Sequence, residues 1–387
     1  MEKPRNPLAK AWRKTPQGLV FLLCFVSLFA LIGHRMGAVP MLNTIMKTAH
    51  DLLLQTVFYL MAICVLTGAI GRMFVEFSVV SMLEKLLRPM MRPLFNLPGV
   101  AALGAVMTFL SDNPAIITLS KDKRFSRYFK KHQFISLTNF GTAFGMGLIV
   151  IIFMIGQGFF AAALVGLFGA FCGCIVSTRL MQRFVVKAYP QYAEENAYDD
   201  PALFDEEAPT IEGEKKGVFM RTLDAMLDGG KTGVDVGLAI IPGVLVISTF
   251  VMILTFGPGP GGQYTGSAYE GVALLPEIAA KGDWFFSLLF GFTDPHQIAF
   301  PITALGAVGA ALSLVPNFLA HGWVDVNAIA VFTAIGMCWS GFLSTHTAML
   351  DSMGYRQLTS KAIAAHTIGG LAAAVAAHWT FALVSLL

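Results

Sequence analysis

Two polar tetrapeptides, each containing an aspartate, interrupt apolar stretches of the sequence. The first, S-D-N-P at residues 111–114, lies inside the apolar run 103–120, and the second, T-D-P-H at residues 293–296, lies inside 288–299. Because hydrocarbon offers no water to the backbone, a helix broken in this way survives in a membrane only where protein or a water-filled cavity surrounds the break. A carboxylate inside a membrane is by default a functional candidate. We therefore predict that Asp112 and Asp294 bind a coupling proton or Na⁺; the alternative is that each caps a helix at the membrane edge.

The composition is typical of a polytopic membrane protein. Of 387 residues, 55% are hydrophobic and 13% are charged, whereas about a quarter are charged in soluble globular domains. A net charge of +3 is too small to indicate binding to nucleic acid. The five cysteines lie in apolar segments and lack the spacing of a disulfide framework or a zinc site. The sequence therefore predicts an all-α polytopic membrane protein.

Basic residues set the expected orientation, because positively charged loops stay on the cytoplasmic side. Residues 1–16 hold five Lys or Arg ahead of the apolar run 18–32, which predicts a cytoplasmic N-terminus and a signal-anchor span in a bacterial inner membrane. Further basic clusters at 72–92 and 121–132 flank the first polar break. If both clusters are cytoplasmic, the broken segment enters and leaves by one face as a re-entrant helical hairpin; a straight crossing is the alternative.

The same order of elements occurs twice, in opposite orientation, which predicts an inverted-topology repeat with two re-entrant hairpins. Amphipathic helices are expected at 79–94 and 218–227. Further spans are expected at about 52–71, 133–156, 158–178, 234–256, 326–342 and 362–387. The predicted organisation is an N-terminal part with the first span (1–48), a first repeat with its hairpin (49–185), an acidic cytoplasmic linker (186–217) and a second repeat with its hairpin (218–387).

Polar residues of the two repeats would enclose one site near the membrane midplane. Helix N-termini at the two breaks would present backbone N–H groups to a solute, and polar stretches at 138–147 and 339–347 would add neutral side chains. His296 and His346 could carry a proton or ligate a metal, although a lone histidine in a membrane bundle is commonly a packing residue. The predicted substrate-binding residues are Asn113, Asn139, Thr142, Gln297, Ser340 and Thr345.

The stretch 86–117, L-L-R-P-M-M-R-P-L-F-N-L-P-G-V-A-A-L-G-A-V-M-T-F-L-S-D-N-P-A-I-I, resembles the nucleoside-recognition (Gate) domain superfamily. That superfamily includes concentrative nucleoside transporters, spore maturation membrane proteins and the membrane part of bacterial ferrous iron transporter B. The resemblance covers residues 50–180, with a weaker copy over 220–387, and it implies helical hairpins and cation-coupled or metal transport. The sequence has no G-x-x-x-x-G-K-[ST] nucleotide loop, so GTP-driven uptake is not expected.

These observations favour a secondary active transporter that moves a small polar solute, nucleoside-like or another small organic molecule, by alternating access. Two alternatives stay open: a non-transporting membrane partner or regulatory protein of the spore maturation type, and a divalent metal permease. An enzyme is not expected, because no nucleophile, base and orienting group occur together. We expect a lipid bilayer as the environment, a homo-oligomer, and no cofactor apart from coupling H⁺ or Na⁺.

Overall fold

The computed structural model describes residues 7–111, 114–197 and 217–386, and this part of the chain is helical, without a β-sheet. Seven of its helical segments are long and apolar enough to cross a membrane, which confirms the prediction of an all-α polytopic membrane protein. They are Pro16–Met36, Ala38–Glu76, Lys131–Gly156, Phe160–Ala188, Val218–Thr255, Val326–Ser352 and Arg356–Val384.

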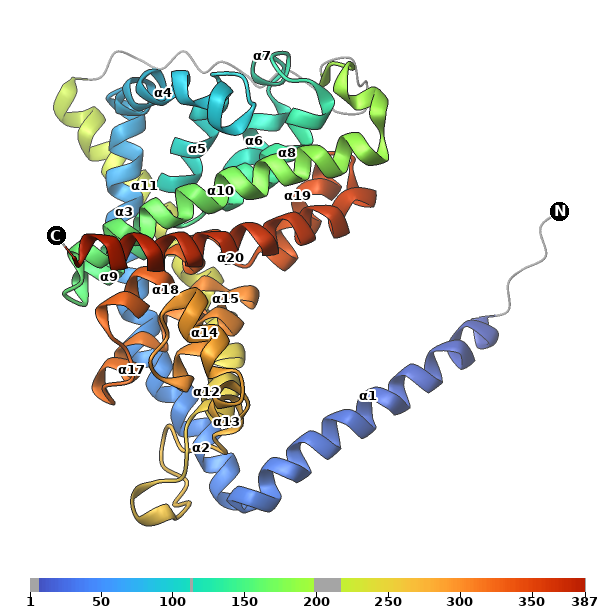
Figure 1. Ribbon diagram of the computed structural model, residues 1–387, viewed down its shortest axis with the longest axis vertical. Helices are drawn as coiled ribbons and strands as arrows, with labels where there is room; N and C mark the ends of the chain where they lie inside the picture. The colour runs from blue at the N-terminus through green and yellow to red at the C-terminus, as the bar shows by residue number, and fades with distance from the viewer. Residues whose placement is uncertain (1–6, 112–113, 198–216, 387) are drawn as a thin grey trace.

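The first span stands apart from the body. Helix α1 (Pro7–Met36) turns at Gly37, whose φ of +80° suits glycine, into α2 (Ala38–Asp51). A π-helical turn (Leu52–Val57) continues α2 into α3 (Phe58–Glu76). In Figure 1, α1 leaves the lower end of the molecule and leans away from it. Most of its apolar side chains from Leu19 to Leu31 are exposed in the isolated chain, as expected for a segment covered by lipid, whereas Ile32 and Met36 near its end are buried.

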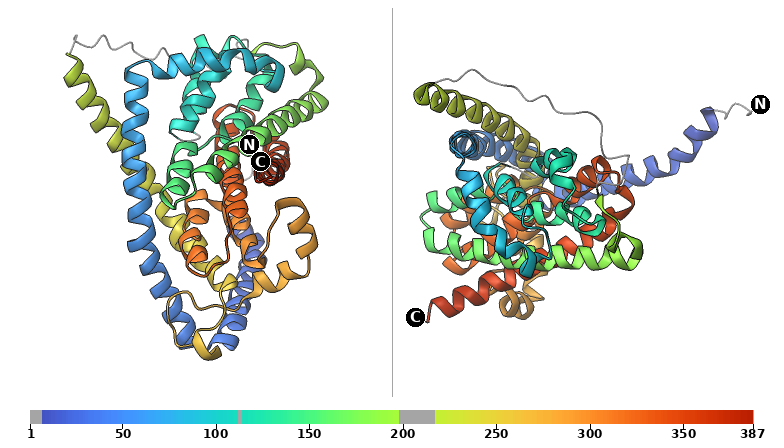
Figure 2. Two further views of the ribbon diagram at one scale, coloured as in Figure 1. Left: turned by 60° about the vertical axis from the view of Figure 1, so that its left-hand side comes forward. Right: turned by 90° about the horizontal axis from the view of Figure 1, so that it is seen from above.

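Helix α3 crosses α11 (Val218–Pro242) through glycines, and Figure 2 shows the two helices passing close together. A Cβ on Gly229 would collide with the carbonyl oxygen of Gly68, and a Cβ on Gly233 with that of Cys64. Small residues at this spacing let membrane helices approach closely. The prediction of a separate amphipathic helix at 218–227 was wrong, because these residues form the first turns of α11, which continues through a π-helical turn (Gly243–Ser248) into α12 (Thr249–Thr255).

A second crossing joins α10 (Phe160–Ala188) and α20 (Thr359–Val384), which lie side by side in Figure 1. Here a Cβ on Gly173 would lie 2.5 Å from the carbonyl oxygen of Gly369. Each crossing therefore pairs one helix of the first half with one helix of the second half, as an inverted repeat requires.

The remaining helices of the first half, apart from α9, gather at the upper end of Figure 1. A Cβ on Gly104 would come within 2.9 Å of Ile116 Cδ1, so α5 and α6 fold back on each other as a helical hairpin. The predicted helix at 79–94 is present as α4 followed by a π-helical turn (Met91–Phe95). The helices are α4 (Val79–Met90), α5 (Ala101–Leu110), α6 (Pro114–Lys121), α7 (Lys123–Ser126), α8 (Lys131–Thr142) and α9 (Gly147–Gly156).

The second half forms its own helical hairpin, but the chain turns at Ala307 rather than at Asp294. Ala307 is extended (φ −164°, ψ 128°), and Gln297 Nε2 donates a 2.8 Å hydrogen bond to the carbonyl of Trp323, which ties the two ends of the hairpin together. The helices are α13 (Leu274–Ala280), α14 (Asp283–Phe290), a 3₁₀ turn (Pro295–Ile298), α15 (Ala299–Gly306), α16 (Val308–Leu312), α17 (Val315–Ala320), α18 (Val326–Cys338), α19 (Phe342–Ser352) and a 3₁₀ turn (Arg356–Leu358).

The predicted tip at 293–296 was wrong because these residues begin a helix. Asp294 accepts a 2.8 Å hydrogen bond from the backbone N–H of His296, and Pro295 occupies the first position of the turn that follows. This is the capping role that an N-cap aspartate commonly has.

Two spans are broken at equivalent places in the two halves. The α8–α9 span changes direction before Gly147, where Met146 has φ +55°, and the α18–α19 span changes direction at Gly341, with φ +69°. These positions match the polar stretches expected at 138–147 and 339–347.

Candidate functional site

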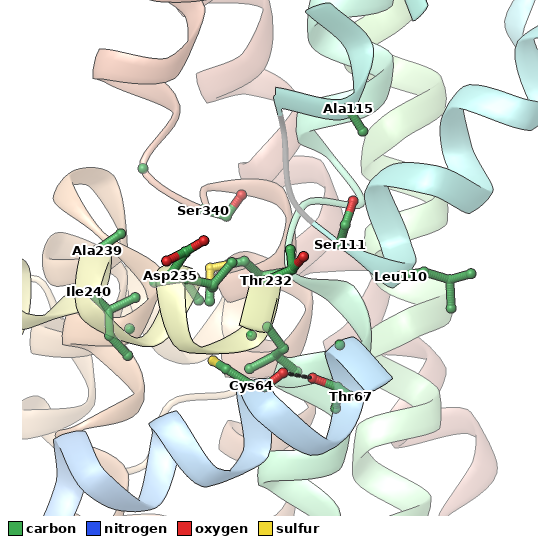
Figure 3. A pocket seen from close by; sticks show the side chains of 18 of the residues that line it. Cys64, Thr67, Leu110, Ser111, Ala115, Thr232, Asp235, Ala239, Ile240 and Ser340 are labelled. Atoms are coloured by element: carbon green, nitrogen blue, oxygen red, sulfur yellow. Dashed lines mark hydrogen bonds between the residues drawn. The ribbon is translucent and has the colours of Figure 1, made fainter. Parts of the chain in front are cut away.

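A cavity of 820 Å³ lies where the two hairpins and the two broken spans meet the α3–α11 pair. The first hairpin contributes Leu110, Ser111 and Ala115, and the second contributes Gly306 and Ala307 at its turn. The broken spans contribute Met146 from the first half, and Ser340 and Gly341 from the second. Figure 3 shows the labelled side chains of α3 and α11 facing Ser111 and Ser340 across this space. Elements of both halves thus converge on one cavity.

Both hairpins approach the α3–α11 pair closely at glycines. A Cβ on Gly71 of α3 would lie 3.1 Å from the carbonyl oxygen of Leu110, at the turn of the first hairpin. A Cβ on Gly309 of the second hairpin would lie 3.1 Å from the Cβ of Ile240 on α11. Each hairpin therefore approaches one helix of the α3–α11 pair closely at a glycine, and Ser248 Oγ, in the turn that follows α11, donates a 3.0 Å hydrogen bond to the carbonyl of Ala310 in the second hairpin.

Most polar groups of the cavity wall are hydroxyls whose protons bond within their own helices. Thr67 Oγ1 donates to the carbonyl of Ile63 at 2.8 Å, Thr232 Oγ1 to that of Asp228 at 3.1 Å, and Thr345 Oγ1 to that of Gly341 at 3.0 Å. A hydroxyl that donates in this way keeps lone pairs free. The wall can therefore accept hydrogen bonds from a solute that carries donor groups.

Two predicted substrate-binding residues line the cavity. Ser340 and Thr345 lie at the break between α18 and α19. Ser340 Oγ also donates to the carbonyl of Thr142, 3.5 Å away, and so links the two broken spans.

Asn139 and Thr142 are fully buried and hold helices together instead. Asn139 Nδ2 donates to Ser177 Oγ at 3.1 Å and to the carbonyl of Ala362 at 3.0 Å, which connects α8 to α10 and α20. Thr142 Oγ1 donates to the carbonyl of Thr138 at 2.8 Å. Neither residue is part of the cavity lining.

Gln297, Asp294 and His296 lie at the base of the second hairpin, away from the cavity lining. Gln297 Oε1 accepts from the backbone N–H of Thr293 at 3.1 Å. The His296 ring stacks on Trp323 with centroids 3.8 Å apart, and its Nδ1 lies 2.6 Å from Asp294 Oδ1. These residues stabilise the hairpin base.

His346 is fully buried on α19, where its Nδ1 donates to the carbonyl of Phe342 at 3.0 Å and its ring lies 4.6 Å from that of His366. Across residues 7–111, 114–197 and 217–386, no three His, Cys, Asp or Glu side chains lie close enough to hold a metal ion. The predicted site residues Asp112 and Asn113 lie outside the described residues.

Two charged residues of the cavity lining were not predicted, Asp235 on α11 and Arg72 on α3. Asp235 lies in V-D-V-G, inside the predicted span 234–256, so the signal was the one used for Asp112: a carboxylate in an apolar run. No proline or further polar residue flanks it to mark a break. The reasoning favoured interrupted helices and therefore missed a charge on an unbroken one.

No family model and no curated protein matches this sequence. Solved structures of CNTnw, a concentrative nucleoside transporter, are similar in fold. The inward-facing substrate-bound state has 14% sequence identity and a TM-score of 0.51, over 94% of this chain and 87% of that chain. A doubly substituted CNTnw in an outward-facing state has 12% identity and a TM-score of 0.51, over 96% and 87%.

A third structure, a singly substituted CNTnw in its intermediate 2 state, has 14% identity and a TM-score of 0.52, over 86% of this chain and 81% of that chain. At such low identities the likeness concerns the fold. The part of the prediction that rested on a Gate domain model is not confirmed, since no family model matches. The chain has a nucleoside-transporter-like fold, in which a cavity lies between the α3–α11 pair and the two hairpins.

Proposed function

We propose that this protein is a secondary active transporter that moves a small polar solute across the cytoplasmic membrane by alternating access. The observation that carries the proposal is the position of the cavity. It lies between a helix pair packed through glycines on one side and, on the other, two hairpins and two helix breaks that come from both halves of the chain. Inverted repeats of this kind place their solute site at the repeat interface.

The packing suggests which part moves. The hairpins, the two broken spans, α10 and α20 pack in one extensive buried core, to which α3 also contributes Leu60, Ile63 and Cys64. Beside the cavity, the hairpins meet α3 and α11 at glycines. We assign α3 and α11 to a fixed scaffold and the remainder of that core to a moving unit. Movement of this unit past the glycine contacts would expose the cavity to one face and then to the other.

We further propose that the cavity opens toward the cytoplasm in this structure. Its lining extends to Arg72 and Val75 at the end of α3, which leads into the basic helix α4. A cysteine at exposed Arg127 should then react only from the same side as Val75→Cys, and Gln263→Cys only from the opposite side. If the cysteines of Arg127→Cys and Gln263→Cys were labelled from the same side of the membrane, this orientation would be contradicted.

The coupling ion is H⁺ or Na⁺ in this proposal. Asp294 caps a helix at the hairpin base and does not line the cavity, so the coupling role falls to the first hairpin. Uptake should depend on a gradient of one of these ions across the membrane.

The test is solute uptake into proteoliposomes that contain the purified full-length protein, with uridine and choline as labelled probes. Thr345→Trp fills the cavity and should lower uptake at least tenfold. The matched control is Ala348→Trp, three residues further along α19 on an exposed position that does not line the cavity, and it should transport at the wild-type rate. Uptake that survives Thr345→Trp would show that solute does not pass through this cavity.

A further inference from the structure

The carboxylate of Asp235 projects into the cavity from an unbroken membrane helix, and it has no partner among the described residues. It lies in the helical segment Val218–Thr255, and its exposed side chain appears in Figure 3 on the face of α11 that borders the cavity. Within the described ranges, Asp235 makes no ion pair, whereas Asp228 on the same helix lies 3.8 Å from the ammonium group of Lys231. A lone carboxylate at this depth is costly unless a ligand or water compensates its charge.

The surroundings of Asp235 do not suit a bare metal ion. Helix α11 is regular from Val218 to Pro242, so the backbone carbonyls around Asp235 are used within the helix. A metal ion such as Ca²⁺ or Mg²⁺ needs about six oxygen ligands, and no set of three His, Cys, Asp or Glu side chains comes together in the described part of the chain. These surroundings suit a cation that pairs with a single carboxylate and otherwise contacts hydroxyl oxygens of the cavity.

An organic ammonium group meets this description, because it brings its own carbon frame and needs only one charge partner. We propose that Asp235 binds the positively charged group of the solute and thereby selects small organic solutes that carry an ammonium group. This inference rests on the proposed transport function and names its substrate class.

Arg72, on α3, is the second charged residue of the cavity lining, and it lies at some distance from Asp235 along the axis of α11. A Cβ on Gly229 would lie 2.7 Å from the Cβ of Arg72, which places Arg72 level with Gly229 on α11. Six residues of helix separate Gly229 from Asp235, which corresponds to about 9 Å along the axis. A solute bound by its ammonium group at Asp235 therefore directs its other end, which carries no further positive charge, toward Arg72.

The first test measures the charge preference of the cavity without requiring transport. Ala239 lines the cavity one helical turn beyond Asp235, where a side chain four residues away is a direct neighbour. In Ala239→Cys, a trimethylammonium methanethiosulfonate reagent should react faster than its sulfonate counterpart. Asp235→Asn should lower this ratio of rates about tenfold, the size expected for one nearby charge. Asp228→Asn, 11 residues from Ala239 on the same helix, is the matched control and should leave the ratio near its original value.

The second test measures ligand binding by thermal unfolding of the purified protein. Choline should stabilise the wild type, Asp235→Glu and Asp228→Asn, whereas its uncharged carbon isostere, dimethylbutanol, should not. Asp235→Asn should lose the choline effect. An unchanged ratio of modification rates in Asp235→Asn would overturn the inference. The inference would also fail if uridine stabilised the wild type and Asp235→Asn equally while choline stabilised neither. The latter result would leave the proposed transport function standing. Absence of uptake by the wild type would reject that function without affecting the charge test.

Discussion

The α3–α11 and α10–α20 crossings both pack through glycines, but one borders a cavity and the other is surrounded by buried side chains. Both bring glycine against backbone carbonyl oxygens of a helix from the other half. Around α10–α20 the gap is closed by a buried polar network in which Asn139 donates to Ser177 and Ser177 bonds to His366 Nδ1 at 2.8 Å. Beside α3–α11 lies the cavity, whose lining includes the charged residues Arg72 and Asp235. In the proposed mechanism, the α10–α20 crossing lies at the centre of the moving unit, and the α3–α11 crossing belongs to the scaffold past which that unit moves.

The largest expected effect is the loss of the α10–α20 crossing. In Gly173→Leu the added side chain would meet the Gly369 carbonyl and Ala373 Cβ, 2.5 and 2.6 Å from the position of the new Cβ. Neither helix can yield without separating the packed unit, so we expect a destabilisation of more than about 4 kcal/mol. The measurement is the yield of monodisperse protein after extraction into detergent.

Gly230→Leu on α11 serves as the comparison for Gly173→Leu. A Cβ at Gly230 would meet only Val65 Cγ1, at 3.7 Å, so this variant should be obtained at the wild-type yield. Equal yields of the two variants would show that α10 and α20 are not held by their glycine contact.

A smaller effect is expected from the polar network of the packed unit. Asn139→Ala removes the amide that donates to Ser177 and Ala362, and leaving buried partners unpaired costs about 1–3 kcal/mol. The thermal unfolding midpoint should fall, while the KM for transport should stay unchanged because Asn139 does not line the cavity. A raised KM with an unchanged unfolding midpoint would indicate that Asn139 binds the solute, as the sequence predicted.

The smallest effect is expected in the loop between α12 and α13, where the backbone N–H of Tyr269 donates a 2.9 Å hydrogen bond to Thr48 Oγ1 of α2. Buried Glu270 accepts hydrogen bonds from Thr265 Oγ1 at 2.6 Å and from the backbone N–H of Gly266 at 2.9 Å. Burial by itself raises the pKa of Glu270, but these hydrogen bonds outweigh it and the net pKa is lowered. Stability from this carboxylate is therefore present above the pKa of an unfolded glutamate, about 4.3, and is lost as pH falls through the lower folded pKa.

The corresponding variant is Glu270→Gln, which we expect to cost about 1 kcal/mol near pH 7. The difference from the wild type should shrink as the pH falls below about 4.3, which thermal unfolding over a pH series measures. A difference that stays constant down to the lowest pH would mean that the Glu270 carboxylate is not held by these bonds.

Hydropathy and charge predicted the seven spans, because the length of an apolar run determines whether it can cross a membrane. The same reasoning identified the polar stretches at 138–147 and 339–347, within which the structure has the two helix breaks, although it predicted no break there. It failed for the second hairpin, whose turn at Gly306–Ala307 is as apolar as the helices it joins, while the polar Asp294 marks the base.

The cavity residues were harder to predict than the spans. Asn139 and Ser340 are both polar residues in broken spans, and only three-dimensional packing shows that one bonds to Ser177 and the other faces the cavity. Asp235 carries the same sequence signal as Asp112, but it lies on a helix without a break. Which polar side chains meet depends on how α11 crosses α3, and this crossing is set by contacts between distant glycines.

The central claim is that the second hairpin moves against α11 during transport. A Cβ on Gly309 would lie 3.1 Å from the Cβ of Ile240, close to the separation of about 3.8 Å in disulfides, so Ile240→Cys combined with Gly309→Cys should form a disulfide between hairpin and scaffold. Uptake of the labelled probes by the oxidised double variant is the direct measurement, with each single variant and the oxidised wild type as controls. We predict that oxidation stops uptake and that reduction restores it; uptake by the fully oxidised protein at the reduced rate would contradict the division into scaffold and moving unit.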